Sequence, residues 1–131
     1  MSGKKCFAFL ALTSIFLSFA PAATAQHSNN CAQLGNRTLY INANGYEGSL
    51  KISGLIPSSP GYKFTAKLTM QGEPTDEIVN GRCRNRNVTF TRKRVGAWTQ
   101  NYNGWIFKRG AYSMAGTFSH NGSVQYGWYA R

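Results

Sequence analysis

The sequence has little of the chemistry that enzymes and metal sites depend on. Its 131 residues include four Asp and Glu against 15 Lys and Arg, with two His and three Cys. General acid-base or triad catalysis needs a nucleophile, a base and an orienting group, and this supply leaves few ways to build one. Zinc needs more ligands than two distant cysteines and two histidines, and no Cys-x-x-Cys pair is present. We therefore predict a protein that is not an enzyme and holds no cofactor and no metal.

Long apolar runs are absent beyond the first 25 residues. That segment begins with Lys4 and Lys5, continues through an apolar stretch that Pro21 interrupts, and closes on Ala23-Thr24-Ala25. A membrane anchor needs about 20 apolar residues, whereas a short apolar run with a small-residue end is typical of a secretory signal peptide. We predict that residues 1–25 are a signal peptide cleaved after Ala25, and that the mature chain is secreted or periplasmic and does not span a membrane.

Removal of the leader would leave two cysteines, Cys31 and Cys83. An even pair in an oxidising compartment predicts a disulfide, which would close a loop of 52 residues. It would tether the N-terminal tail, residues 26–36, to the domain formed by residues 37–131.

Apolar and polar residues alternate along most of that domain. From Tyr62 to Met70 the alternation is unbroken, which is the pattern of a half-buried strand. Turn residues, of which Asn121-Gly122 is the clearest pair, separate the strands from one another. The other strands are expected near Leu39–Ala43, Tyr46–Ile52, Glu77–Cys83, Asn87–Arg94, Trp98–Phe107, Tyr112–Ser119 and Val124–Arg131.

Eight short strands with short connections predict an all-β fold, a single antiparallel meander. Closing the meander into an eight-stranded up-and-down barrel removes its exposed edges, and a β-sandwich is the alternative. The meander, its Gly-containing hairpins and the aromatic residues of the late strands resemble small secreted barrels of the avidin and lipocalin type. The resemblance is one of architecture, and no biotin-site motif or lipocalin Gly-x-Trp is present. It implies no ligand.

Basic residues concentrate in one segment that contains no acid. Its members are Arg82, Arg84, Arg86, Arg92, Lys93 and Arg94. Such a cluster favours an anion-binding face for an acidic polymer or an anionic surface, since Arg matches phosphate and sulfate geometry. A merely solvated surface is the alternative. Without a nucleic-acid-binding motif, we expect no specific recognition of nucleic acid.

The alternation in the strand from Asn87 to Arg94 gives Arg92 the parity of the inward residues Val88 and Phe90. In the following strand, Gln100 shares its parity with Trp98 and Tyr102. A few polar groups among inward aromatic residues, Trp128 included, are typical of a ligand pocket. The alternative is that Arg92 lies beyond the rim in solvent and Gln100 is a hydrogen-bonded core amide. A bulge near Thr91 that reverses the register would also remove the pocket.

Two aromatic residues, Trp105 and Tyr129, have the opposite parity to their neighbours and are expected to face outward. There they would contact a glycan or a protein, and simple packing on the surface is the alternative. The sequence thus favours a binding module for an anionic polymer, a glycan or a small ligand. One alternative is an inhibitor or capture protein for another exported protein. Another is a small hydrolase or ribonuclease that uses His120, Glu47 and Arg92.

Overall fold

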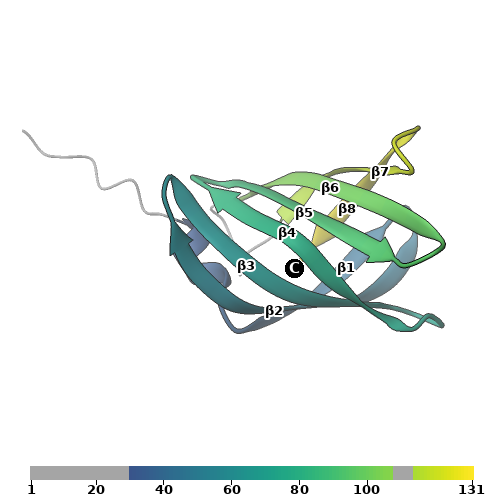
Figure 1. Cartoon of the computed structure of the whole chain (residues 1–131), viewed down its shortest axis with the longest axis horizontal. Helices are drawn as coiled ribbons and strands as arrows, with labels where there is room; N and C mark the ends of the chain where they lie inside the picture. The colour runs from purple at the N-terminus through teal and green to yellow at the C-terminus, as the bar shows by residue number, and fades with distance from the viewer. Residues whose placement is uncertain (1–29, 108–113) are drawn as a thin grey trace, which may run out of the picture.

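A computed structural model of the chain describes residues 30–107 and 114–131. It shows a closed barrel of eight antiparallel strands in which each strand pairs with its neighbours in sequence and β8 closes on β1 (Figure 1). The strands are β1 Arg37–Ala43, β2 Tyr46–Ser58, β3 Gly61–Met70, β4 Thr75–Arg84, β5 Asn87–Arg94, β6 Trp98–Ile106, β7 Met114–His120 and β8 Gln125–Ala130. The predicted all-β meander and its closure into a barrel are confirmed. The predicted signal peptide, and residues 112–113 of the predicted seventh strand, lie outside the described residues.

Strand β2 extends six residues beyond the predicted end at Ile52. The extension passes a bulge, where the pairing with β3 shifts between Ser53 and Ile56 and where Gly54 has a φ of 59°. A side chain is strained at such a φ, so glycine suits this position. The bulge interrupts the alternation of side chains and so hides the second half of the strand from a search for a period of two.

Below its open end, the barrel interior is filled by inward side chains from the strands. Leu50 of β2, Leu68 of β3 and Phe90 of β5 are among the buried apolar residues, and the residues that alternate with them along each strand face outward. Burial of apolar surface is the main stabilising contribution to such a fold. This core occupies the part of the barrel beneath the candidate site.

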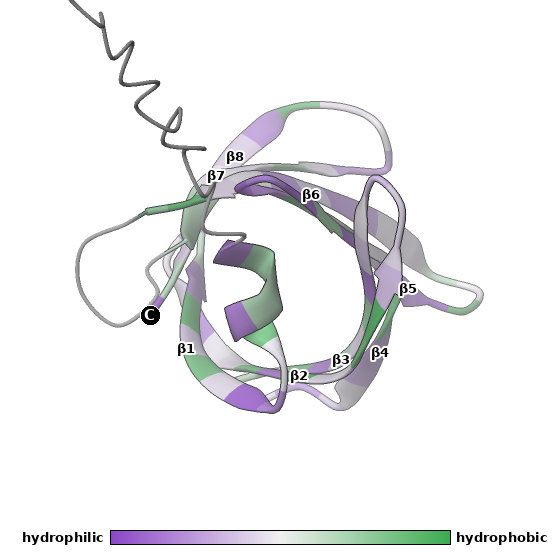
Figure 2. Cartoon of the chain, turned by 90° about the vertical axis from the view of Figure 1, so that its left-hand side faces the viewer, coloured by the Kyte–Doolittle hydropathy of each residue, from purple (hydrophilic) through white to green (hydrophobic). Residues whose placement is uncertain are grey.

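A short 3-10 helix, η1 (Asn30–Leu34), closes one end of the barrel. Figure 2 looks onto this end and shows η1 lying within the ring of strands. Leu34 and Cys31 are fully buried, and Cys31 forms the predicted disulfide with Cys83 of β4, with 5.7 Å between their Cα atoms. The opposite end carries four turns and, among the described residues, has no such plug, so the barrel has a capped end and an open end.

Within the described residues, no helix has the length and apolar character needed to cross a membrane.

Candidate functional site at the open end of the barrel

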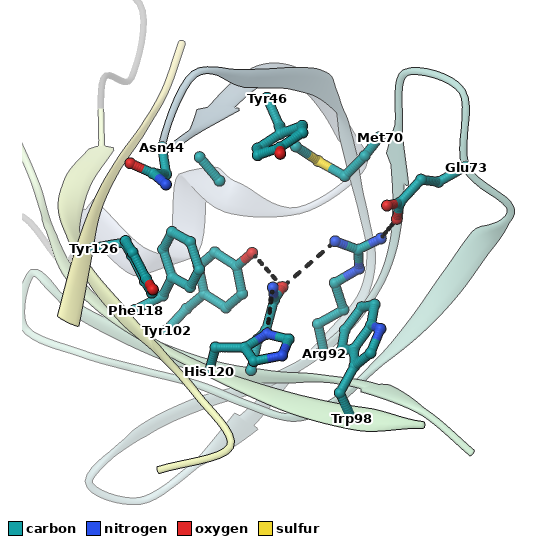
Figure 3. Close-up of a pocket in the computed structure, with 12 residues that line it drawn as sticks. Asn44, Tyr46, Met70, Glu73, Arg92, Trp98, Tyr102, Phe118, His120 and Tyr126 are labelled. Atoms are coloured by element: carbon teal, nitrogen blue, oxygen red, sulfur yellow. Dashed lines mark hydrogen bonds and ion pairs between the residues drawn. The ribbon is translucent and has the colours of Figure 1, made fainter. Parts of the chain in front are cut away.

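A cavity of about 360 Å³ lies at the open end (Figure 3). This volume falls within the range of small-molecule sites. Tyr46 and Met70 lie on the side of the cavity opposite His120 and Trp98. The lining residues come from every strand except β4, or from the turns: Ala43, Asn44, Tyr46, Met70, Glu73, Arg92, Trp98, Gln100, Tyr102, Phe118, His120 and Tyr126.

Aromatic rings form the floor of the cavity. Phe90, Tyr102, Phe118 and Tyr126 are partners in register across β5, β6, β7 and β8. The Tyr102 ring is stacked between Phe90 and Phe118, with ring centroids 4.5 and 4.9 Å away. Burial raises the pKa of the Tyr102 phenol to about 12. Phe90, Tyr102 and Phe118 belong to the buried core, and Tyr102 and Phe118 also line the cavity, so the core continues directly into the apolar part of the cavity.

One step nearer the mouth, the same strands carry a polar row. Arg92, Gln100 and His120 are register partners on β5, β6 and β7. The Gln100 Oε1 atom accepts hydrogen bonds from the Tyr102 hydroxyl at 2.9 Å and from Arg92 Nη1 at 3.4 Å. Its amide nitrogen therefore faces His120 Nδ1, 3.3 Å away, and the imidazole accepts that hydrogen bond.

Two carboxylates fix the arginine of this row. Arg92 is only 3% exposed; it donates from Nε to Asp76 Oδ2 and from Nη2 to Glu73 Oε2, both at 2.7 Å. Arg94 Nη2 also donates to Asp76 Oδ2 at 2.8 Å. Burial raises the pKa of Asp76, but the hydrogen bonds from Arg94 and Arg92 outweigh burial, and its pKa lies below the ordinary value. The four charges cancel, so the cluster is electrically neutral.

Trp98 covers this cluster at the rim. The guanidinium carbons of Arg92 and Arg94 lie 4.7 and 4.8 Å from the centroid of its ring, within the range of cation–π contacts. Every buried side-chain nitrogen and oxygen in the described part of the chain has a hydrogen-bond partner. The polar wall is therefore held in place before any ligand arrives.

Comparisons of the chain with protein-family models, curated proteins and solved structures found no match. The closed eight-strand barrel is consistent with the architecture of the avidin and lipocalin type. A function must therefore be argued from the chemistry of the site itself.

The structure brings together four of the five residues predicted to form a pocket. Arg92, Trp98, Gln100 and Tyr102 line the cavity, whereas Trp128 does not. Trp128 lies one row deeper, where its indole nitrogen donates to the carbonyl oxygen of Thr117 at 3.1 Å and the ring packs in the core. Residue parity assigns a side chain to the inside of a barrel, but it does not say how far from the mouth that side chain lies.

The residues predicted to form an anion-binding surface divide between the two ends. Arg82, Arg84 and Arg86 are exposed near the capped end. Lys93 is exposed near the open end, six residues along β5 from Asn87, a separation of about 20 Å. Arg94 is partly buried and paired with Asp76 and Glu73. Trp105 and Tyr129 face outward on β6 and β8, 54% and 42% exposed.

Sequence reasoning missed the two carboxylates that pair with Arg92. Asp76 and Ile78 are buried, whereas Thr75, Glu77 and Val79 between and beside them are exposed. Extending the alternating pattern back by one residue from Glu77 would have placed Asp76 inside. Glu73 lies in a turn and gave no such signal.

The three residues weighed for a hydrolase are not assembled. Glu47 lies on the outer face of β2 beside Tyr40, while His120 and Arg92 line the cavity. In the described segments, no three His, Cys, Asp or Glu side chains lie close enough together to hold a metal ion.

Proposed function

We propose that the protein is a non-enzymatic binding module that holds a small, neutral, ring-shaped polyhydroxyl ligand, a carbohydrate unit, in the open end of its barrel. The observation that carries the proposal is the polar row of Arg92, Gln100 and His120 set directly above a floor of stacked aromatic rings. A sugar ring has an apolar face that packs on an exposed aromatic ring, which Tyr46 offers at the cavity, and hydroxyl groups that need fixed hydrogen-bond partners. A cavity with both features matches that chemistry.

The charge of the site favours a neutral ligand over an anion. Arg92 is the cation that lines the cavity, and its charge is already balanced by Asp76 and Glu73. An anionic ligand would have to compete with these two carboxylates, while a hydroxyl group only has to exchange hydrogen bonds with water.

The disulfide between Cys31 and Cys83 supports a secreted or periplasmic location, because such bonds persist in oxidising compartments.

Tyr46 provides the sharpest test of the site. Its ring is 68% exposed and lines the cavity, so Tyr46→Ala should leave the fold intact. Binding of mono- and disaccharides is measured by calorimetry, or by tryptophan fluorescence as Trp98 responds. For a saccharide that binds, we expect the variant to bind about tenfold more weakly, which corresponds to about 1.4 kcal/mol.

Tyr129→Ala is the matched control, since Tyr129 is also an exposed tyrosine but lies on the outer face of β8. It should bind like the unmodified protein. A loss of binding in Tyr129→Ala but not in Tyr46→Ala would place the ligand on the outer surface and refute the proposal. The absence of saccharide binding across the panel would refute it as well.

A second candidate function is the capture of another exported protein by the turns of the open end. Val95 and Val124 are 89% and 64% exposed on two of these turns. Exposed apolar side chains at loop tips are suited to a protein partner. Val95→Ser with Val124→Ser should abolish capture of such a partner in a pull-down and leave saccharide binding unchanged.

A further inference from the structure

The basic and aromatic residues of the outer surface, which are distant in sequence, form one strip near the capped end. Arg84 of β4 pairs in register with Asn87 of β5, and Asn87 pairs with Trp105 of β6. All three have outward parity, because Cys83, Val88 and Ile106 beside them are buried. Two strand spacings separate Arg84 from Trp105, about 10 Å. One bound chain segment can therefore contact both residues.

Further cations extend this strip. Lys63 of β3 lies directly opposite Arg82 of β4, and both are exposed. Arg82 and Arg84 are about 7 Å apart along β4, and Arg86 follows in the turn. Like charges directly opposite each other destabilise a sheet, so Lys63 and Arg82 repel each other across β3 and β4.

No carboxylate offsets these charges. The chain contains four acidic residues, Glu47, Glu73, Asp76 and Glu77, and all of them lie in the half of the barrel toward the open end. Asp76 and Glu73 pair with Arg92 and Arg94, and Glu77 pairs with Lys67. The acidic residues thus neutralise the open end and leave the capped end strongly positive.

We propose that this strip, formed by Lys63, Arg82, Arg84, Arg86 and Trp105, binds a linear acidic polysaccharide. Its sulfate or carboxylate groups would pair with the cations, and a sugar ring would pack on the exposed indole. Asn87, Thr89 and Asn103 are the polar side chains that adjoin the cations and the indole. The Asn87 amide nitrogen donates to Asn103 Oδ1 at 2.8 Å, which fixes both side chains on this surface. Phe107, which is 50% exposed and has the same outward parity as Trp105, places a second ring beside the cations. The predicted export of the chain favours a polysaccharide over a nucleic acid as the ligand of these rings and cations.

The strip and the cavity lie at opposite ends of the barrel, so both can be occupied at once. A protein held on an acidic polymer by its capped end would present its open end to solution. The proposal does not depend on the ligand of the cavity.

Heparin is the probe for the test, with binding measured by calorimetry over a series of salt concentrations. Arg82→Ser with Arg84→Ser should raise the dissociation constant at least about tenfold. Its salt dependence should weaken by about two in the log-log slope, one for each arginine replaced, by analogy with polyanion binding to DNA. Trp105→Ala should raise the constant about three- to tenfold.

The matched control is Lys51→Ser with Lys93→Ser, which removes the same charge from exposed strand positions outside the strip. We expect it to change the dissociation constant less than about twofold. The unfolding midpoint of each variant verifies that it folds. If Arg82→Ser with Arg84→Ser does not fold, Arg82→Gln with Arg84→Gln takes its place. Tyr46→Ala should bind heparin normally, which separates this test from that of the cavity.

Several outcomes would overturn the proposal. If Arg82→Ser with Arg84→Ser and Lys51→Ser with Lys93→Ser weaken heparin binding equally, only the net charge of the protein matters. Unchanged binding by Trp105→Ala would remove the indole from the site. Displacement of heparin by an oligothymidylate at equal charge concentration would point to nucleic acid instead, and the absence of heparin binding would reject the strip altogether.

Discussion

The buried ion pair of Arg92 allows a quantitative prediction for Asp76→Asn. This exchange keeps the shape of the side chain but removes the charge that receives hydrogen bonds from Arg92 at 2.7 Å and Arg94 at 2.8 Å. The Arg92 side chain is 4% exposed and would retain Glu73, itself 41% exposed, as its last carboxylate partner. Loss of one partner from a buried pair costs about 3 to 5 kcal/mol, and the remaining Glu73 places our expectation at the lower end, about 3 kcal/mol.

Equilibrium unfolding in urea at neutral pH measures this loss. With a slope of about 1.5 kcal/mol per molar, typical for a domain of this size, the midpoint should fall by about 2 M. Such a loss is a substantial fraction of the roughly 5 to 15 kcal/mol that stabilises most domains. The slope itself should not change, because the native barrel still forms.

The difference in the free energy of unfolding between the unmodified protein and Asp76→Asn should depend on pH, and this dependence gives a second check. The pKa of Asp76 is lowered in the folded state, so its contribution is present above the ordinary carboxyl pKa of about 3.9. It is lost as the pH falls through the lower folded value. Below that value the native carboxyl is protonated and resembles the amide, so the stabilities of the two proteins should converge.

Glu77→Gln is the control, because it makes the same chemical change at an exposed ion pair with Lys67. Such surface pairs contribute about 0 to 1 kcal/mol. If Asp76→Asn costs no more than Glu77→Gln, the buried carboxylate does not hold Arg92 in place, and the polar wall of the cavity is not fixed by its ion pairs.

Two further outcomes follow from the packing of the barrel interior. Gly104→Ala should lower the free energy of unfolding by about 1 to 3 kcal/mol, because the added Cβ would lie 2.5 Å from Cζ2 of Trp128. Gly127→Ala, whose Cβ meets nothing within 4 Å, serves as its control, and equal costs would contradict the packing described. Tyr102 should resist ionisation until about pH 12 in an ultraviolet titration of tyrosinate. Because this pKa is raised on folding, its contribution to stability is complete below about pH 10 and is lost between there and about pH 12. A Tyr102 that titrates with the exposed tyrosines would disprove its burial.

The alternation of apolar and polar residues was sufficient to predict that there are eight strands and the side on which Arg92 and Gln100 lie, but it missed the second half of β2 and the first two residues of β4. In β5 the pattern runs without interruption from Asn87 to Arg94, so parity alone places Arg92 inside. The bulge considered near Thr91 lies on the partner strand β4, between Val79 and Arg82, and leaves β5 regular. The disulfide was equally predictable, since Cys31 and Cys83 are the only cysteines beyond residue 25.

Register and closure decided the rest, because they bring together residues that have no relation in sequence. The depth of Trp128, the pairing of Arg92 with Asp76 and Glu73, and the line from Arg84 to Trp105 all depend on which residues face each other across strands. A period of two in the sequence distinguishes the side chains that point into the barrel from those that point out of it. Position along the barrel axis and neighbours across the sheet exist only once the eight strands have paired.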